Sequence, residues 1–583
     1  MPSDSTGSRR AIARRLLPFS SWRRPTAETI RADLIAGIVV TLVLVPQSMA
    51  YAALAGLPPY YGLYAAFLPV ITAAVWGSSP QLATGPVAVV ALLTASALTP
   101  LAEPGSGEFI TLAIALAFLV GIIQLVLGLV SLGTLVNFIS HPVIVGFTNA
   151  AAIVIALSQL NDLLGVPIER GGAFLASIAG VLGRIPDTHM ATLLFGLAAI
   201  AIMLACRRRV PRIPGVLAAV LVLTPISYVI GFEELGGRVV GNVPQGIPTP
   251  ALPVLDLGTL ATLVTTAAVI ALVGFMEAVS IAKAIAARTR DRIDPNQELV
   301  GQGLGNLVAA FSQAFPVSGS FSRTAVNYNG GARSGLSSVF AGLLVALTLL
   351  ALTPLLYHLP LSVLAAIIIM AVAGLVNLQA VPRIWRTHRH DGAAAATTFV
   401  ATLAFAPHLD YGIMLGAALA IVLYLYRSMR PRTVILSRHA DGTLRDARRF
   451  GLRESKHIIA LRFDGALYFG NVGHLEDVVL QANNEYPRAR FLILVGDGIN
   501  AVDSSGVETL HALRERLHDN GITLVLAGMK LQVLETMKGA GLCKEIGGEN
   551  IHRNEDEAIL AIHGRIDDPD FNPDDCPLAP IHY

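Results

Sequence analysis

Between Arg31 and Arg427 the sequence consists of one apolar run after another. Only 14% of the residues in the chain are charged, whereas an ordinary soluble domain carries about a quarter. We count about fourteen hydrophobic segments, most of them near the roughly 20 residues that a helix needs to cross the hydrocarbon core of a bilayer. This pattern predicts an α-helical polytopic membrane protein surrounded by lipid.

The positions of arginine residues indicate how the predicted segments are oriented. Loops 207–212, 288–292 and 383–389 are rich in arginine, whereas loops 102–108 and 231–237 carry no lysine or arginine. Because cytoplasmic loops are the basic ones, this alternation places both termini in the cytoplasm. An odd number of segments in each half inverts one half relative to the other, so we predict a seven-plus-seven inverted repeat. The predicted segments begin near Ile30, Gly56, Val87, Phe109, Phe138, Thr192, Gly215, Leu260, Glu298, Ser322, Leu336, Leu361, Ala393 and Ile413.

Two of these segments contain helix-breaking residues within apolar sequence. One contains Gly85 and Pro86, and the other contains Pro316 and Gly319. A helix that starts inside a membrane leaves its first backbone N–H groups unpaired, with the positive end of its dipole pointing inward. Such starts are tolerated only where they line a cavity or meet a ligand, and paired interruptions in the two halves of a chain point to a transporter's binding site. The sequence therefore predicts an anion site between two helix starts.

Small polar side chains lie close to both breaks. The hydroxyl groups there belong to Thr84, Ser318, Ser320, Ser322 and Thr324. Together with backbone N–H groups they are donors that suit an oxyanion. In the first segment Gln47 follows a proline and is a further donor to the same anion. The alternative for Gln47 and Ser48 is a hydrogen bond between helices at the proline kink.

Two ionisable residues lie away from the ends of the predicted segments. Glu277 is near the middle of the eighth segment, and Arg323 is at the start of the tenth. Charges inside a membrane are costly, so each is a candidate functional residue. A carboxylate removed from water takes up a proton more readily, which makes Glu277 the candidate proton carrier. The alternatives are structural: Glu277 pairs with a cation such as Lys283, or Arg323 forms a helix-locking salt bridge with Glu277.

The composition divides the chain into five regions. Residues 1–29 form a basic cytoplasmic segment, and residues 30–430 form the membrane domain. A polar linker at 431–456 follows, and residues 566–583 form an acidic, proline-rich tail that we predict to be disordered. Residues 457–565 alternate strand-like and helical runs, which predicts a small domain with helices packed on a sheet.

Within this small domain Val502 to Gly506 reads Val-Asp-Ser-Ser-Gly, between a predicted strand and a predicted helix. Such a cluster is typical of a helix N-cap. The alternative is a regulatory phosphoserine or an anion contact at the start of the helix.

Several other classes of protein do not fit the sequence. The net charge of +2 argues against a nucleic-acid partner. The three cysteines are far apart and match no disulfide or metal spacing. We see no nucleophile–base pair and no cofactor motif, so we expect neither an enzyme nor a cofactor beyond a coupling ion. The arginine-rich start does not resemble a signal peptide.

Three stretches resemble the sulfate permease family of anion transporters, namely Leu44–Pro69, Asn296–Asn306 and Phe315–Ser334. The Val-Asp-Ser-Ser-Gly motif resembles that of the STAS domain, which follows the permease in this family. The resemblance covers Thr29 to Arg565. It implies separate core and gate domains, elevator-type alternating access, and homodimers formed through the gate and STAS parts.

The resemblance also implies which residues contact the anion. By position, the family's site maps to Gln47, Val87, Ala88, Ser320, Phe321, Ser322 and Arg323. Thr84 and Gly85 at the first break complete the candidate substrate-binding set. Members that resemble proton-coupled sulfate importers carry a glutamate where this chain has Glu277, whereas sodium-coupled bicarbonate relatives place an aspartate and hydroxyls near there. In similar STAS motifs the second serine is phosphorylated, which is Ser505 here and suggests a soluble partner for this domain.

We therefore predict a proton-coupled symporter for a small inorganic anion, sulfate first, in the cell (inner or plasma) membrane. Alternatives with the same fold carry bicarbonate with sodium, carry a dicarboxylate, or exchange chloride for bicarbonate. An uncoupled anion channel is a different class, and a carboxylate beside an anion site argues against it. A membrane-tethered signalling protein that uses the STAS domain as its output leaves the paired breaks and buried charges unexplained.

Overall fold

The computed structural model describes residues 26–133, 140–166, 174–210, 213–253, 256–406, 408–569 and 571–580. The chain forms two compact units, Met1–Ala420 and Ile421–Tyr583, which are described separately below. Nearly all of the basic segment predicted at 1–29 lies outside the described residues.

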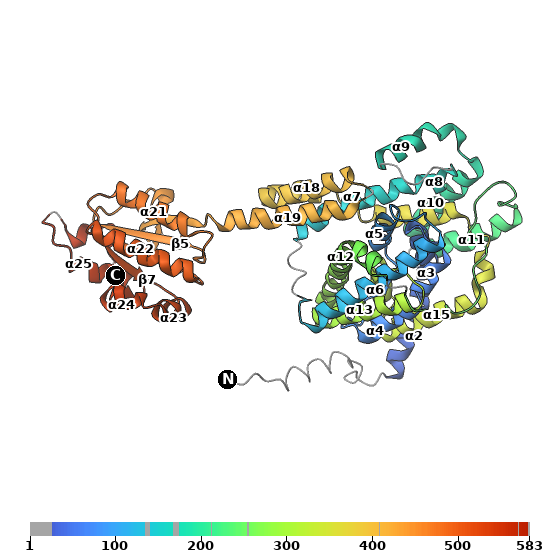
Figure 1. Ribbon diagram of the computed structural model, residues 1–583, viewed down its shortest axis with the longest axis horizontal. Coiled ribbons are helices and arrows are strands. Elements are labelled where there is room, and N and C mark those ends of the chain that lie inside the picture. The colour runs from blue at the N-terminus through green and yellow to red at the C-terminus, as the bar shows by residue number, and fades with distance from the viewer. Residues whose placement is uncertain are drawn as a thin grey trace. The chain divides into compact units, whose positions relative to one another are not determined.

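The first unit is helical, with two very short strands (Figure 1). Each of the predicted segments corresponds to a helix that starts within a few residues of the predicted position. Its elements are α2 (Ala27–Leu54), α3 (Tyr60–Ala65), α4 (Leu68–Trp76), β1 (Thr84–Gly85), α5 (Ala88–Leu98), α6 (Gly107–Leu129), α7 (His141–Ser158), α8 (Leu160–Leu164), α9 (Phe174–Gly183), α10 (Met190–Arg209), α11 (Gly215–Val229), α12 (Leu257–Thr289), α13 (Pro295–Phe311), β2 (Ser318–Gly319), α14 (Phe321–Asn329), α15 (Leu336–Leu347), α16 (Leu361–Ala373), α17 (Ala380–Thr387), α18 (Arg389–Ala404) and α19 (Leu409–Ser428).

The outer surface of this unit is apolar, as a lipid-facing surface must be. Among the described residues, seven helical segments are long and apolar enough to cross a membrane. Large apolar side chains point outward, including Leu194 on α10 and Leu221 and Val229 on α11, which are 60%, 64% and 79% exposed. Exposed apolar surface on this scale is unfavourable in water. The polytopic membrane fold expected from the sequence is confirmed.

Glycines allow several helices to pack at very short distances. α13 packs against α6 and α4, and the three are labelled in Figure 1. A Cβ atom on Gly121 of α6 would lie 2.7 Å from the backbone nitrogen of Leu307, and one on Gly303 of α13 would lie 2.5 Å from that of Leu125. Only glycine permits such an approach between membrane helices. α13 is therefore held in one register against α6.

The second unit contains a six-stranded sheet with the strand order β4-β3-β5-β6-β7-β8. The strands β5 to β8 are parallel, and β3 is antiparallel to both of its neighbours. The elements are β3 (Arg432–Arg438), β4 (Leu444–Asp446), α20 (Ala447–Phe450), β5 (Ile458–Asp464), α21 (Val472–Glu485), β6 (Phe491–Val495), α22 (Ser504–Asp519), β7 (Thr523–Ala527), α23 (Leu531–Gly539), α24 (Leu542–Ile546), β8 (Ile551–His552) and α25 (Glu555–His563).

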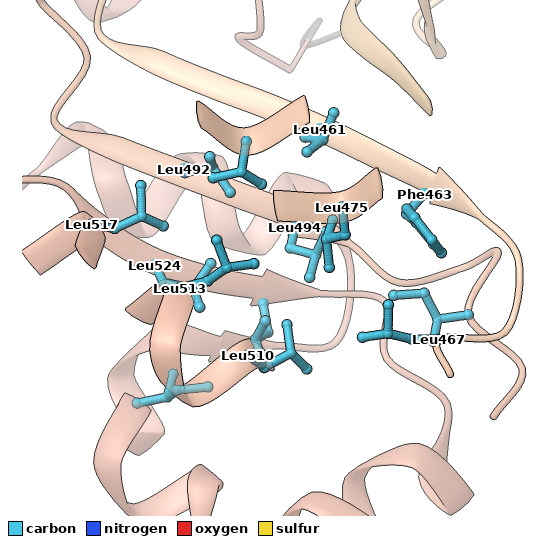
Figure 2. Packing of buried hydrophobic residues seen from close by; sticks show 14 of the residues in the cluster. Leu461, Phe463, Leu467, Leu475, Leu492, Leu494, Leu510, Leu513, Leu517 and Leu524 are labelled. Carbon is cyan, nitrogen blue, oxygen red and sulfur yellow. The ribbon is translucent and has the colours of Figure 1, made fainter. Parts of the chain in front are cut away.

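Alternating residues of this sheet bury two apolar faces. Leu461 and Leu494 pack with Leu475 of α21 and Leu510 of α22 on one face (Figure 2). Their neighbours in the strands, such as Ile458 and Ile493, form the other face. The alternation follows from the two-residue period of a strand, and it confirms the predicted α/β domain.

The segment 431–456, predicted as a polar linker, belongs to this domain. Strand β3 pairs with β5 through Val434 and Ile435, and β4 pairs with the other edge of β3. The prediction of a linker was wrong because the polar residues of a short edge hairpin obscure the few apolar positions that face the sheet.

The tail at 566–583, predicted to be disordered, packs on the second face of the sheet over its described residues. Leu578 is fully buried there and Cys576 nearly so. The guanidinium of Arg438 donates hydrogen bonds to the carbonyl oxygens of Leu578 and Ala579 at 3.0 and 3.1 Å. Composition was misleading here because two buried side chains and one arginine order the segment against a preformed apolar face.

Candidate functional site

The two predicted breaks lie side by side. Strands β1 and β2 pair antiparallel, with Thr84 opposite Gly319 and Gly85 opposite Ser318. Helices α5 and α14 begin directly after these strands. An antiparallel pairing is what two halves related by inversion require. The sequence-based prediction that two helix starts come together inside the membrane domain is thus confirmed.

The two helix starts differ in how their first N–H groups are satisfied. At α5 the N-cap residue Val87 offers no side-chain cap, and Val87 and Ala88 are buried. At α14 the hydroxyl of Ser320 accepts a hydrogen bond from the backbone nitrogen of Arg323 at 3.4 Å. Uncapped N–H groups at the positive end of a helix dipole favour an anion. The α5 start is therefore the more open of the two to a ligand.

Gln47 points a free acceptor into buried surroundings. It lies on α2 directly after Pro46, its side chain is 4% exposed, and its Oε1 has no hydrogen-bond partner among the described residues. Ser48 instead donates to the carbonyl oxygen of Val45 at 2.9 Å. Ser48 therefore serves its own helix. The free Oε1 of Gln47 is an acceptor and cannot hold an oxyanion, so a contact between Gln47 and the anion would use its amide nitrogen and stays a prediction.

The hydroxyl groups near the breaks have mixed roles. Thr84 accepts a hydrogen bond from Gln302 at 2.8 Å, and Ser318 donates to the carbonyl oxygen of Gly274 at 2.7 Å. Thr324 accepts from the backbone nitrogen of Ala83 at 3.0 Å. These three side chains hold the breaks in place. The side-chain hydroxyls of Ser320 and Ser322 lie 3.4 Å apart, and neither hydroxyl forms a described hydrogen bond to another helix.

Of the aromatic and hydroxyl residues at the start of α14, two are exposed. Phe321 is 55% exposed and Ser322 is also exposed, whereas Ser320 is 5% exposed. Phe321 and Ser322 therefore lie at the surface of this unit, whereas Ser320 is buried at the helix start.

Arg323 is the largest fully buried side chain in the described structure. None of its three guanidinium nitrogens has a hydrogen-bond partner among the described residues. Its Nη2 lies 3.3 Å from the position that a Cβ atom on Gly85 would occupy, so Arg323 reaches the first break from the second. A buried and unpaired cation is costly. An anion bound beside it would offset that cost.

Glu277 is the carboxylate that interacts electrostatically with Arg323. Its Oε2 is buried without a hydrogen-bond partner, and Arg323 is the charge that acts on it. The described ion pairs do not include a salt bridge between the two residues or one with Lys283. Tyr51, one helical turn after Gln47 on α2, is buried and interacts electrostatically with both. Tyr51 was missed, although its four-residue spacing from Gln47 was a usable signal.

A second group was missed on α13. Glu298, Gln302 and Asn306 recur every fourth residue within apolar sequence and are all buried. This spacing places three polar side chains on one helix face, which is a signal that the sequence alone contains.

In the second unit Ser505 lies in the first turn of α22 and is half-buried. The N-cap is Asp503, whose carboxylate accepts from the backbone nitrogens of Gly506 at 2.8 Å and Phe469 at 3.0 Å. The cluster therefore caps a helix, as the sequence predicts, and leaves the modification of Ser505 as a prediction.

These features define a polytopic membrane protein with a buried arginine beside two paired helix breaks, and with a separate α/β domain. The chain belongs to the sulfate permease family, whose model matches residues 30–398, and a STAS domain matches residues 449–558.

Two curated relatives cover almost the whole chain. It is 36% identical to "Probable sulfate transporter 4.2" of Arabidopsis thaliana, over 92% of this chain and 81% of that protein. It is 32% identical to "Probable sulfate transporter MT1781" of Mycobacterium tuberculosis, over 92% of this chain and 96% of that protein. The fold is similar to murine Solute Carrier 26 family member A9, solved in the inward-facing state, with a TM-score of 0.86, 23% identity and coverage of 96% and 95% of the two chains.

Proposed function

We propose that this protein is a proton-coupled symporter for an inorganic oxyanion, with sulfate as the first choice. The observation that carries the proposal is the fully buried guanidinium of Arg323, unpaired among the described residues and placed beside two helix starts. The names of the curated relatives, which are sulfate transporters, support sulfate as the cargo.

In the proposed mechanism the anion enters between the α5 and α14 starts. The N–H groups of Val87 and Ala88, the side chain of Gln47 and the hydroxyl of Ser320 hold its oxygens, and Arg323 offsets part of its charge. Because the site binds one anion through several fixed donors, it needs no rearrangement of the helix starts themselves.

Glu277 supplies the coupling in this proposal. The oxygen of Glu277 that lacks a hydrogen-bond partner takes up a proton when the anion is bound. The bound anion interacts with Arg323, so the positive charge of Arg323 then stabilises the ionised carboxylate of Glu277 less. Proton and anion would cross together through a rigid-body, elevator-type movement of the core domain against the gate domain. Sodium as the coupling ion is the competing possibility.

The same proposal covers location and assembly. We place the protein in the inner or plasma membrane with both termini in the cytoplasm, because the arginine-rich loops lie on one side of the predicted topology. We propose a homodimer and a soluble partner for the STAS domain, with Ser505 as the residue through which that partner acts. No enzymatic role is proposed.

The test is the uptake of labelled sulfate into proteoliposomes with an inward proton gradient. Wild type is compared with Glu277→Gln, which keeps the shape of the side chain and removes its titration. The expected result is gradient-driven uptake by wild type, and anion exchange without proton drive in the variant. Parallel runs use bicarbonate and fumarate, with and without sodium. Sodium-driven bicarbonate uptake without sulfate uptake would overturn both the cargo and the coupling ion.

A further inference from the structure

Three polar side chains form a row along one face of α13. Glu298, Gln302 and Asn306 are four residues apart, and their exposed fractions are 1%, 0% and 0%. We call these three residues the α13 ladder. Residues at this spacing stack above one another on a helix. Polar groups buried in a membrane domain are costly, and their hydrogen-bond partners show what the row does; among the described residues Gln302 Oε1 is left without one.

The first two members hold the chain at the first break. One carboxylate oxygen of Glu298 accepts hydrogen bonds from the backbone nitrogens of Ser78 and Ser79 at 2.9 and 3.1 Å. The amide of Gln302 donates to the hydroxyl of Thr84 at 2.8 Å and to the other carboxylate oxygen of Glu298 at 3.3 Å. The segment that leads into β1 is thus anchored at both of its ends.

The third member holds the second break. The side-chain oxygen of Asn306 accepts from the backbone nitrogen of Val317 at 2.8 Å, and its amide donates to the carbonyl oxygen of the same residue at 3.1 Å. An asparagine that accepts from the N–H and donates to the C=O of the same residue acts like a neighbouring strand. Its amide also reaches Gln124 of α6, which donates to Ala271 of α12 at 3.0 Å.

α13 itself is a stiff support for these contacts. Besides the close approach to α6, a Cβ atom on Gly301 would lie 2.6 Å from the Cα atom of Gly77, at the end of α4. The helix therefore cannot slide along either neighbour without a clash. A displacement of one ladder residue would be passed to both breaks.

We infer that the α13 ladder sets the separation and orientation of the α5 and α14 starts, and through them the size of the anion that the site accepts. This inference rests on the proposed function, because it assigns specificity to the same site. The ladder residues are positioning residues, since their contacts are with the breaks. Glu298 differs from Glu277 in this respect: its oxygens are hydrogen-bonded, whereas Glu277 keeps one without a partner.

The first test compares Asn306→Ala with a matched control. The control is Asn149→Ala. The side-chain oxygen of this buried asparagine accepts a hydrogen bond from the backbone nitrogen of Asn377 at 2.5 Å, and its described contacts do not include either break. In proteoliposomes we expect Asn306→Ala to raise the KM for sulfate about tenfold with Vmax nearly unchanged, and to reduce discrimination against the larger selenate. Asn149→Ala leaves both unchanged. Equal effects of the two substitutions would overturn the inference.

The second test does not depend on transport. Hydrogen exchange is measured on the full chain in detergent for peptides covering residues 78–85 and 314–320. Glu298→Ala removes the acceptor for Ser78 and Ser79 and the link to Gln302, but no direct contact with residues 314–320. We nevertheless expect about tenfold faster exchange in both segments, because the ladder couples their opening. Glu298→Gln keeps an acceptor for Ser78 and Ser79 but places an NH2 group where an oxygen accepts from Gln302, so we expect a smaller increase in exchange than in Glu298→Ala.

The possible outcomes distinguish a failure of the ladder inference from a failure of the proposed function. Faster exchange confined to residues 78–85 would refute the ladder whether or not sulfate is carried. Coupled exchange together with unchanged anion discrimination in Asn306→Ala would refute the assignment of specificity. Absence of sulfate uptake by wild type would refute the proposed cargo, and the size comparison would then use the anion that wild type carries.

Discussion

Replacing Gly85 by alanine tests whether the pairing of β1 with β2 controls anion binding. Gly85 has φ of +146°, a backbone conformation that is open almost only to glycine. The new Cβ atom would lie 3.3 Å from Nη2 of Arg323 and 3.5 Å from the Cγ2 atom of Val70. Backbone strain of this kind costs about 1–3 kcal/mol. The backbone strain is relieved by moving β1 away from β2, and the close contact by displacing the guanidinium of Arg323.

Both movements disturb the site, so the strain should appear as lost anion affinity. Since 1.4 kcal/mol is a factor of ten, we expect the KM for sulfate to rise by about tenfold to hundredfold. The assay is sulfate uptake into proteoliposomes, with thermal unfolding of the same samples to measure stability. Vmax is expected to change less than KM, because Glu277, the proposed proton carrier, is untouched.

The matched control is Gly105→Ala. Gly105 also has a positive φ, +81°, but no atom lies within 4 Å of the position of its new Cβ. We expect a loss of stability of about 1 kcal/mol with an unchanged KM. If the two substitutions raise KM equally, or if Gly85→Ala leaves it unchanged, then the argument from the β1–β2 pairing fails.

Three further predictions concern single side chains. Gln47→Ala should raise the KM for sulfate about tenfold, whereas Ser48→Ala, which loses only a bond within its own helix, should leave it unchanged in the same uptake assay. Leu578→Ala should destabilise the docked tail by about 2–4 kcal/mol, seen as faster hydrogen exchange in β3 and β5, while a substitution of the exposed Asp575 changes exchange little. Burial lowers the pKa of His563, which packs against Phe571, so the tail should loosen as the pH falls below the ordinary histidine value of about 6.5. Limited proteolysis of the tail checks this, and the pH dependence should weaken in His563→Leu, which leaves the contact between His457 and Asp568 of the tail in place.

Much of the fold could be predicted because it depends on local composition. A helix that crosses a bilayer must be apolar along about 20 residues, so each one is visible in the sequence. The strands β5, β6 and β7 were visible for a similar reason, as short apolar runs between turn residues. The short hairpin at 431–456 and the tail were not, because their order comes from a few contacts with a sheet face that forms elsewhere in the chain.

The site was predictable in part. Gly85, Pro316 and Gly319 showed where two helices break, and Glu277 and Arg323 stood out as charges in apolar sequence. Tyr51 and the α13 ladder were not predicted as site residues. Their four-residue spacing was visible in the sequence and indicates a shared helix face, but it does not show what that face contacts.

The sequence by itself determined that this chain enters a membrane, where its helices start and where two of them break, because hydrocarbon penalises every unpaired backbone group. Only the tertiary structure decided that Thr84 and Gly85 lie against Ser318 and Gly319, and that Arg323 extends from one break to the other. These contacts join residues more than two hundred positions apart. They depend on the packing of α13 between α4 and α6, which no local pattern specifies.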